Sequence, residues 1–234
     1  MSESKAVQAV VLAAGAGTRL GRPYPKPLVE LANGQSILGQ QISNLRGQWP
    51  DIRITIVVGF KFEMIMEEFP DVSFAYNEVY DQTNTSKSLL KALRLSGPGG
   101  VLWLNGDVVF DARILDRIQG HMTAEESFVC VDQAKVGTEE VKYTLGEDGG
   151  IAELSKTVYA PVGEAVGINF VGRDDKATLI RHLEAVAEQD YFERAIEVAI
   201  AEAGVRFQPV DISDLFALEV DFQSDLDQAN QHQG

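Results

Sequence analysis

Several residue types and patterns are scarce in this sequence of 234 residues, and each scarcity excludes a class of protein. The single cysteine, Cys130, excludes an internal disulfide and is typical of a reducing compartment. Its apolar neighbours predict a small buried strand residue rather than a nucleophile. None of the histidines, His121, His182 and His232, has a partner at metal-ligand spacing, so we expect surface residues there.

Positive charge is also scarce, with 20 Lys and Arg residues against 35 Asp and Glu residues and a net charge of −15. A polyanion would be repelled on average, so nucleic acid is not an expected partner. No apolar run approaches membrane-spanning length, and the start of the chain lacks the pattern of a secretory signal. We therefore expect a cytoplasmic protein that does not enter a membrane and acts on small molecules, as a monomer or a homodimer.

Strand-like and helix-like segments alternate along the first part of the chain. Near-continuous apolar runs, typical of strands covered on both faces, occupy residues 7–12, 54–58, 101–104 and 128–131. Helical patterns with capping residues lie between them, at residues 36–45, 61–69, 86–95 and 111–118. This alternation predicts a doubly wound α/β sheet.

The second part of the chain has a different character. A β-hairpin is expected at residues 142–154, followed by a strand at 165–171 and helices at 176–187 and 192–203. Strand-like segments at 205–212 and 215–220 precede a helix that starts at Ser224. Since no repeat or linker marks a boundary, we predict one α/β domain over residues 1–234. Its fold class is a doubly wound, Rossmann-like mixed β-sheet flanked by helices, with a β-hairpin insertion and a frayed tail at 230–234.

The strongest chemical signal is a run of small residues directly after the first predicted strand, in the segment Leu12-Ala13-Ala14-Gly15-Ala16-Gly17-Thr18-Arg19-Leu20. Without bulky side chains, the backbone amides of such a loop can approach phosphate oxygens closely. Arg19 and Lys26 add positive charge near the same anion, and flanking prolines restrict the backbone around Lys26 in Pro25-Lys26-Pro27-Leu28. The spacing fits neither the Walker pattern nor the dinucleotide-binding glycine fingerprint.

These two segments resemble the signatures of the nucleotide-sugar-type nucleotidyltransferase superfamily, Leu-Ala-Ala-Gly-x-Gly-x-Arg-Leu and Pro-Lys-Pro-Leu. The resemblance implies the nucleotide-diphospho-sugar transferase fold, with a nucleotide-binding half at residues 1–130 and an acceptor-binding half at 131–229. It also implies that the residues from Leu12 to Arg19 wrap the base and the phosphates. Lys26 would then contact phosphate, which makes Arg19 and Lys26 the expected catalytic residues.

Two carboxylates follow apolar strands, where the catalytic groups of open α/β sheets gather. Asp107 closes the segment Asn105-Gly106-Asp107, and Asp221 follows Leu218-Glu219-Val220. Either aspartate could simply cap a turn. Together they can hold Mg²⁺, a cation that prefers oxygen ligands, and the resemblance implies this metal-binding role. Glu219 is expected on the opposite face of its strand and is a poorer ligand candidate.

A further series of segments is similar to the choline-phosphate cytidylyltransferase-like branch of the superfamily, over nearly the full chain. It comprises residues 83–89, 163–168, 191–195 and 219–221. The similarity implies that Asn84, Ser88 and Asn105 lie near the nucleotide, and that Glu164 and Tyr191 lie on the acceptor side. For Ser88, ordinary helix-start chemistry is an equal alternative.

Lys87 departs from the pattern of that branch, whose phosphocholine-binding members usually carry an aromatic residue at this place. A quaternary ammonium group binds aromatic faces and is repelled by a lysine. If Lys87 faces the acceptor, a doubly anionic acceptor such as an acidic phosphonate is expected. The alternative is a lysine that faces solvent.

The sequence thus predicts a Mg²⁺-dependent enzyme that transfers CMP from CTP to a small phosphomonoester or phosphonate and releases pyrophosphate. The choice of CTP comes from the resemblance. One alternative is a sugar-1-phosphate nucleotidyltransferase, a branch whose members are usually longer. Another is a regulatory protein that binds a nucleotide without catalysis, against which the intact set of Arg19, Lys26, Asp107 and Asp221 argues.

Overall fold

The computed structural model describes residues 7–134, 136–137 and 140–232. Its strands are β1 (Gln8–Ala13), β2 (Arg53–Val58), β3 (Ser73–Tyr76), β4 (Val101–Asn105), β5 (Val108–Phe110), β6 (Phe128–Asp132), β7 (Lys142–Leu145), β8 (Ile151–Ser155), β9 (Gly163–Val171), β10 (Gln208–Asp211) and β11 (Ala217–Glu219). Its helices are α1 (Ile37–Gln48), α2 (Phe62–Glu68), α3 (Thr85–Leu95), α4 (Arg113–Ala124), α5 (Arg173–Ala185), α6 (Phe192–Ala203) and α7 (Gln223–His232). Two short 3₁₀ turns, η1 (Thr18–Leu20) and η2 (Lys26–Leu28), follow β1.

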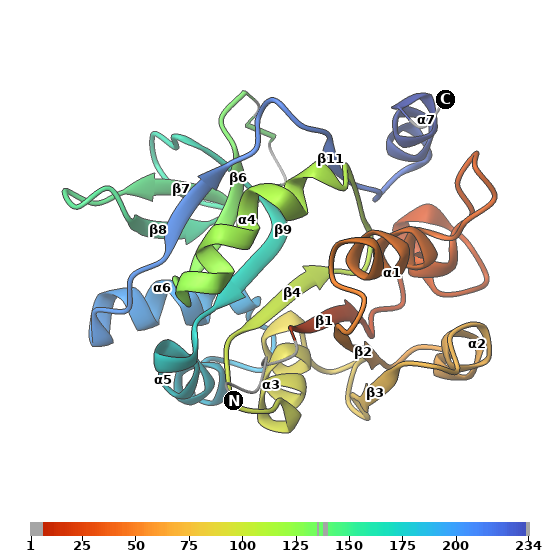
Figure 1. Ribbon diagram of the computed structural model, residues 1–234, viewed down its shortest axis with the longest axis horizontal. Coiled ribbons are helices and arrows are strands. Elements are labelled where there is room, and N and C mark those ends of the chain that lie inside the picture. The colour runs from red at the N-terminus through yellow and green to blue at the C-terminus, as the bar shows by residue number, and fades with distance from the viewer. Residues whose placement is uncertain (1–6, 135, 138–139, 233–234) are drawn as a thin grey trace.

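A mixed sheet forms the centre of the molecule, with the strand order β10-β6-β9-β4-β1-β2-β3. Strands β4, β1, β2 and β3 run parallel, whereas β9 lies antiparallel between β4 and β6. Strands β7 and β8 form the predicted hairpin, which is attached to β9. Helices cover both faces of this sheet (Figure 1).

Strand β1 shows how the sheet separates two apolar cores. Val10 and Leu12 belong to the cluster built with helices α3, α5 and α6. Ala9, Val11 and Ala13 belong to the cluster built with α1, α2 and α4. Burial on both faces is what a near-continuous apolar strand requires, because successive side chains point to opposite sides.

The strand order reverses at β1, which lies between β2 and β4. The chain first proceeds outward from β1 through β2 to β3, and then returns to the other side of β1 as β4. In open α/β sheets such a switch point opens a crevice at the carboxyl ends of the strands, where ligands bind.

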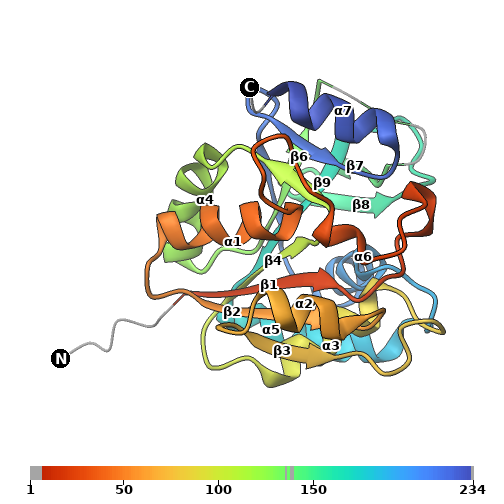
Figure 2. The ribbon, with the colours of Figure 1, turned by 90° about the vertical axis from the view of Figure 1, so that its right-hand side faces the viewer.

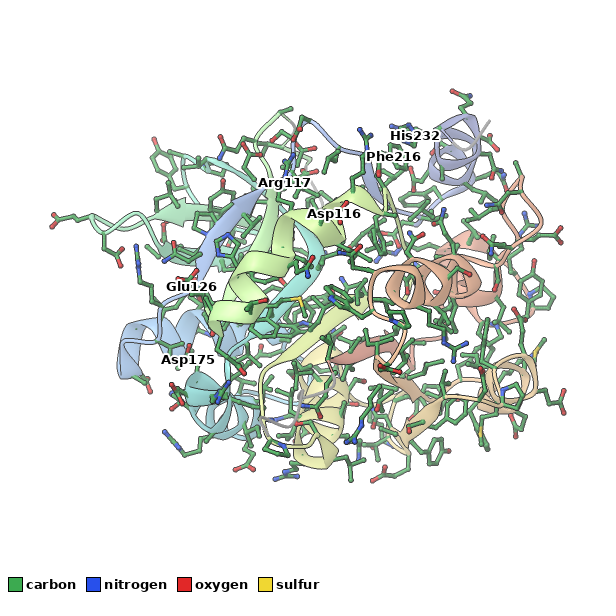
Figure 3. The ribbon with its side chains drawn as sticks, viewed as in Figure 1. Asp116, Arg117, Glu126, Asp175, Phe216 and His232 are labelled. Atoms are coloured by element: carbon green, nitrogen blue, oxygen red, sulfur yellow. The ribbon has the colours of Figure 1, made fainter. Side chains whose placement is uncertain are left out.

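A two-stranded ribbon of β5 and β11 and the helix α7 complete the domain, with α7 over the upper part of the molecule in Figure 2. Phe216, just before β11, stacks on His232 of α7 with ring centroids 4.0 Å apart, and Figure 3 shows the two side by side. Arg117 of α4 donates a hydrogen bond of 2.9 Å to the carbonyl of Asp211 and pairs with Asp214. These contacts hold the connection between β10 and β11, and therefore the position of β11.

The α/β architecture expected from the alternating pattern is confirmed. The short strands β3 and β5 are missing from the prediction because four and three residues give too little periodicity to recognise. Helix α4 begins at Arg113 rather than at Asp111, whose carboxylate accepts a hydrogen bond from the Arg113 amide at 2.9 Å. The expected frayed tail is wrong for residues 230–232, which belong to α7, and residues 233 and 234 lie outside the described part of the chain.

Candidate active site

A cavity of about 330 Å³ opens at the carboxyl ends of β1 and β4, at the switch point of the sheet. It is lined by Leu12, Ala13, Gly15, Gly17, Thr18, Arg19, Lys26, Pro27, Asn84, Thr85, Asn105, Gly106, Asp107, Glu140, Val141, Lys156, Ala165, Gly167, Tyr191, Phe192, Glu193, Glu219 and Asp221. These residues come from the loop after β1, the end of β4, the start of α3, the hairpin region, the start of α6 and the end of β11. Segments far apart in the sequence therefore meet in one place.

The small-residue loop after β1 brings its backbone close to Lys26. Gly17 adopts φ +57, a left-handed conformation that costs glycine little. A Cβ at this position would lie 2.6 Å from the Cβ of Lys26. Only a residue without a side chain fits there, so Gly17 allows the loop to fold back over the turn η2 that carries Lys26.

The ammonium group of Lys26 lies between two carboxylates from distant strands. Its Nζ atom is 2.6 Å from an Asp107 oxygen and 2.6 Å from an Asp221 oxygen. The second oxygen of Asp221 pairs with the guanidinium group of Arg19. Burial alone would lower the pKa of Lys26, but the charge of Asp107 and the hydrogen bonds to both carboxylates raise the pKa above its usual value.

The ribbon of β5 and β11 holds the two aspartates near each other. The Val220 amide, between Glu219 and Asp221, donates a hydrogen bond of 3.0 Å to the Asp107 carbonyl. The Asp225 carboxylate accepts hydrogen bonds from the amides of Asp221 and Phe222 at 3.0 and 2.7 Å. The backbone on both sides of Asp221 is thus fixed before any ligand binds.

The donor set at this point fits a hard divalent cation. Both aspartates reach a single cationic atom, and the other oxygen of Asp107 is buried without a hydrogen-bond partner among the described residues. The neighbouring side-chain oxygen of Asn105 is also buried without a hydrogen-bond partner among the described residues. Mg²⁺ is commonly held by one or two carboxylates together with water and substrate phosphates, and therefore does not need a larger protein cluster. Within the described residues no group of three or more His, Cys, Asp or Glu side chains has metal-ligand geometry.

Three further carboxylates line the cavity, those of Glu140, Glu193 and Glu219. Burial raises the pKa of Glu219, and the negative charge of Asp107 raises it further. Glu219 accepts a hydrogen bond of 2.8 Å from the Asn105 amide group. Burial likewise raises the pKa of Glu140, and it raises the pKa of Glu193 to about 7. Lys156 also lines the cavity, and its Nζ lies 5.1 Å from the centroid of the Tyr191 ring.

The cavity contains most of the residues predicted to bind the nucleotide. Leu12, Ala13, Gly15, Gly17, Thr18, Arg19, Asn84 and Asn105 all line it, as do Lys26, both predicted metal ligands and Tyr191. Asn84 caps α3 at the cavity wall, where its side chain accepts a hydrogen bond of 2.8 Å from the Thr85 amide.

Other predicted site residues lie outside the cavity lining. Ala14 is buried in the apolar core, and Ala16 also does not line the cavity. Ser88 is buried, accepts a hydrogen bond of 3.0 Å from Asn77 and does not line the cavity. The Glu164 carboxylate accepts a hydrogen bond of 2.7 Å from the Gly137 amide and does not line the cavity either.

Lys87 contradicts both interpretations drawn from the sequence, since it faces neither the cavity nor solvent. It is only 8% exposed, and its ammonium group donates to the carbonyls of Leu183, Glu184 and Val186 at 2.9, 3.2 and 2.7 Å. These carbonyls lie at the end of α5, where the backbone lacks intrahelical partners. Lys87 therefore caps a helix, and the reason for expecting an acidic acceptor is removed.

Several residues that line the cavity were missing from the sequence prediction. The expectation for Glu219 is wrong, because it stands two residues before Asp221 and a strand places such residues on the same face. Glu193 could have been recognised as a charged residue within the apolar face of α6, next to Phe192 and Ile196. Glu140 and Lys156 carry no comparable signal, because they lie in irregular segments.

The chain is similar to several known nucleotidyltransferases. The chain is 29% identical over 246 residues to the CMP-5'-(3-aminopropyl)phosphonate synthase of Streptomyces rubellomurinus, covering 96% of this chain but only 38% of that protein. It is 25% identical to the 2-aminoethylphosphonate cytidylyltransferase of Lancefieldella rimae, over 93% of this chain and 90% of that protein. The solved structure of the CTP:phosphocholine cytidylyltransferase of Streptococcus pneumoniae has the same fold, with a TM-score of 0.73 at 19% identity, covering 98% of this chain and 100% of that one.

No helix in the described part of the chain is long and apolar enough to cross a membrane.

The family model of the MobA-like NTP transferase domain matches residues 9–197. That range contains the loop after β1, Lys26 and Asp107, which contribute to the lining of the cavity. Because the match covers most of the chain, the protein belongs to the family of MobA-like NTP transferase domains, and the resemblance of its sequence to nucleotidyltransferases is confirmed.

Proposed function

We propose that the protein is a Mg²⁺-dependent cytidylyltransferase that transfers CMP from CTP to a small phosphonate or phosphomonoester and releases pyrophosphate. The observation that carries this proposal is the convergence of Asp107, Asp221 and Lys26 at the open end of β1 and β4. The choice of CTP and of a phosphonate is supported by the names of the two relatives, both of which refer to aminoalkylphosphonates.

The residues of this chain would act mainly by positioning and by charge. The loop after β1 would hold the phosphates of the nucleotide, with Arg19 and Lys26 stabilising the negative charge on the departing pyrophosphate. An acceptor phosphonate is already ionised near neutral pH, so its oxygen attacks the α-phosphorus in line without a general base. Asp107 and Asp221 would hold Mg²⁺, which supplies positive charge to the reacting phosphate groups.

The first test is pyrophosphate release with each of the four NTPs against 2-aminoethylphosphonate, phosphocholine, an acidic phosphonate and glucose-1-phosphate. We expect release with CTP and a phosphonate or phosphocholine in the presence of Mg²⁺. Activity only with a sugar phosphate would assign the chain to the sugar-1-phosphate branch. A thermal shift with CTP and Mg²⁺ but no product with any acceptor would indicate a regulatory nucleotide-binding protein.

The second test concerns the paired aspartates. We expect Asp107→Asn and Asp221→Asn each to lower kcat by at least about 100-fold, because each change removes a carboxylate that would hold Mg²⁺ against the reacting phosphates. The exposed Asp51→Asn is the matched control and should leave kcat unchanged. Near-normal kcat in either of the first two variants, with unchanged Mg²⁺ dependence, would contradict the assignment of these ligands.

A further inference from the structure

Glu193 lies on the first turn of α6 with its side chain at the wall of the cavity. The residue is only 7% exposed, and its neighbours Phe192, Ala195 and Ile196 are fully buried. One of its carboxylate oxygens has no hydrogen-bond partner among the described residues. Glu193 thus carries a buried carboxylate among apolar neighbours in a residue that lines the cavity.

A buried carboxylate of this kind lowers the stability of the folded protein when no ligand is bound. Buried carboxylates are normally paired or accept several hydrogen bonds, because removal of their charge from water is unfavourable. No cation of the described residues lies within 4.0 Å of Glu193. Burial raises its pKa to about 7, although the more distant charge of Lys156 acts in the opposite direction. A bound ligand that brings a positive charge would remove this cost.

The surroundings of Glu193 favour a cationic ligand over an anionic one. Glu140 and Glu219 also line the cavity, and among its described lining residues Lys156 is the cation that is not paired with Asp107 or Asp221. Lys87, which could have attracted an anion, points away and caps α5. The cations Arg19 and Lys26 lie near Asp107 and Asp221, at the end where the phosphate groups are expected.

The aromatic groups of the cavity are poorly placed for a quaternary ammonium. Lys156 already stands over the Tyr191 ring, and Phe192 is fully buried against Trp103 with ring centroids 5.6 Å apart. A quaternary ammonium has no N–H group and binds chiefly through aromatic faces. A carboxylate with a free oxygen instead suits an ammonium group that can donate hydrogen bonds.

We infer that Glu193 is the residue that determines acceptor specificity, by accepting a hydrogen bond from a protonated amine at the end of the acceptor opposite the phosphonate. This inference rests on the proposed cytidylyl transfer and adds a role that the comparisons do not assign to any residue. Glu193 thereby selects an acceptor with N–H groups against one that carries a hydroxyl or a quaternary ammonium in the same place.

The test uses two acceptors of nearly equal size, 2-aminoethylphosphonate and 2-hydroxyethylphosphonate, with phosphocholine as a third. Each is assayed for pyrophosphate release with CTP and Mg²⁺, using the wild-type protein, Glu193→Gln and the control Glu202→Gln. Glu202 lies on the same helix α6 but is exposed, so its substitution makes the same change of charge away from the cavity. Thermal melts check that all three proteins fold.

We expect Glu193→Gln to lower kcat/KM for the amine about 10- to 100-fold, mainly through KM, because a charge-assisted hydrogen bond is lost. The kcat/KM for the hydroxyl acceptor should change by less than about 3-fold. Glu202→Gln should leave kcat/KM unchanged for both acceptors. Equal losses for both acceptors would show a structural role for Glu193 and overturn the inference. Absence of pyrophosphate with every acceptor in the wild-type protein would instead contradict the proposed function itself.

Discussion

At the scale of single residues, the site is organised by charges that are held near each other before any ligand binds. Lys26 shields Asp107 from Asp221, whereas Glu193 has no cation within 4.0 Å among the described residues. The ion pairs of Lys26 with Asp107 and Asp221 stabilise the folded protein. Glu193 lowers the stability of the folded protein when its carboxylate is ionised, because burial favours the neutral form.

The raised pKa of Glu193 predicts a dependence of stability on pH. The folded pKa of about 7 exceeds the ordinary value of 4.5, so the folded state binds more protons between these values and loses stability as the pH rises through this window. Glu193→Gln removes this titration. Relative to the wild type, the variant should therefore gain up to about 3 kcal/mol of unfolding free energy between pH 4 and pH 8.

Urea unfolding of both proteins across this pH range measures the effect, with Glu202→Gln as the control that should run parallel to the wild type. A constant difference between wild type and Glu193→Gln at every pH would contradict the burial of an ionisable carboxylate.

Many lining residues of the cavity could be predicted from the sequence, because they lie in short contiguous motifs with unusual composition. The loop from Leu12 to Arg19 and the turn around Lys26 are of this kind. Other lining residues could not be predicted to the same extent. Glu140, Lys156 and Glu193 come from three separate segments, and only the folded chain places them around one cavity.

At the scale of elements, the site depends on how loops leave the ends of strands and helices. The loop after β1 requires Gly17, both for its φ of +57 and for the approach of Lys26. The end of α5 requires the ammonium group of Lys87, which bonds three of its carbonyls. Lys87 also shows a limit of sequence interpretation, because a lysine that caps a distant helix has the same local sequence as one that faces a ligand.

Gly17→Ala should be more damaging than the matched change Gly21→Ala. Both residues have a left-handed φ, +57 and +65, and a Cβ should cost roughly 1 to 2 kcal/mol at either position for that reason. At Gly21 the Cβ meets nothing within 4 Å, whereas at Gly17 it meets Lys26 at 2.6 Å. We therefore expect Gly17→Ala alone to displace Lys26 and to lose most of kcat. Similar kcat in the two variants would contradict the close approach of the loop to Lys26.

Lys87→Met should affect stability and leave acceptor choice intact. Removing the ammonium group leaves buried carbonyls at the end of α5 without a donor, which should cost about 1 to 3 kcal/mol. Lys91→Met, one turn further along α3, removes only a partly exposed ion pair with Glu78 and should cost less than about 1 kcal/mol. A selective loss of activity toward an acidic phosphonate in Lys87→Met, without loss of stability, would restore the acceptor-facing interpretation.

At the scale of the whole molecule, the fold gathers residues from both parts of the chain around one cavity. The first part of the chain contributes the loop and the strand ends that suit phosphates, and the second part contributes the hairpin, α6 and β11 with their carboxylates. The parallel sheet could be predicted because long apolar strands alternate with helices. The antiparallel insertion of β9 between β4 and β6 could not, since strand order depends on contacts between distant segments.

The most direct test of the proposed activity is ³¹P NMR of the protein mixed with CTP, Mg²⁺ and 2-aminoethylphosphonate. We predict that the signals of CTP and of the free phosphonate disappear together, while those of pyrophosphate and of a phosphonate joined to a nucleoside monophosphate appear in equal amounts. Hydrolysis of CTP with an unchanged phosphonate signal, or no change in any signal with this or another acceptor, would contradict cytidylyl transfer.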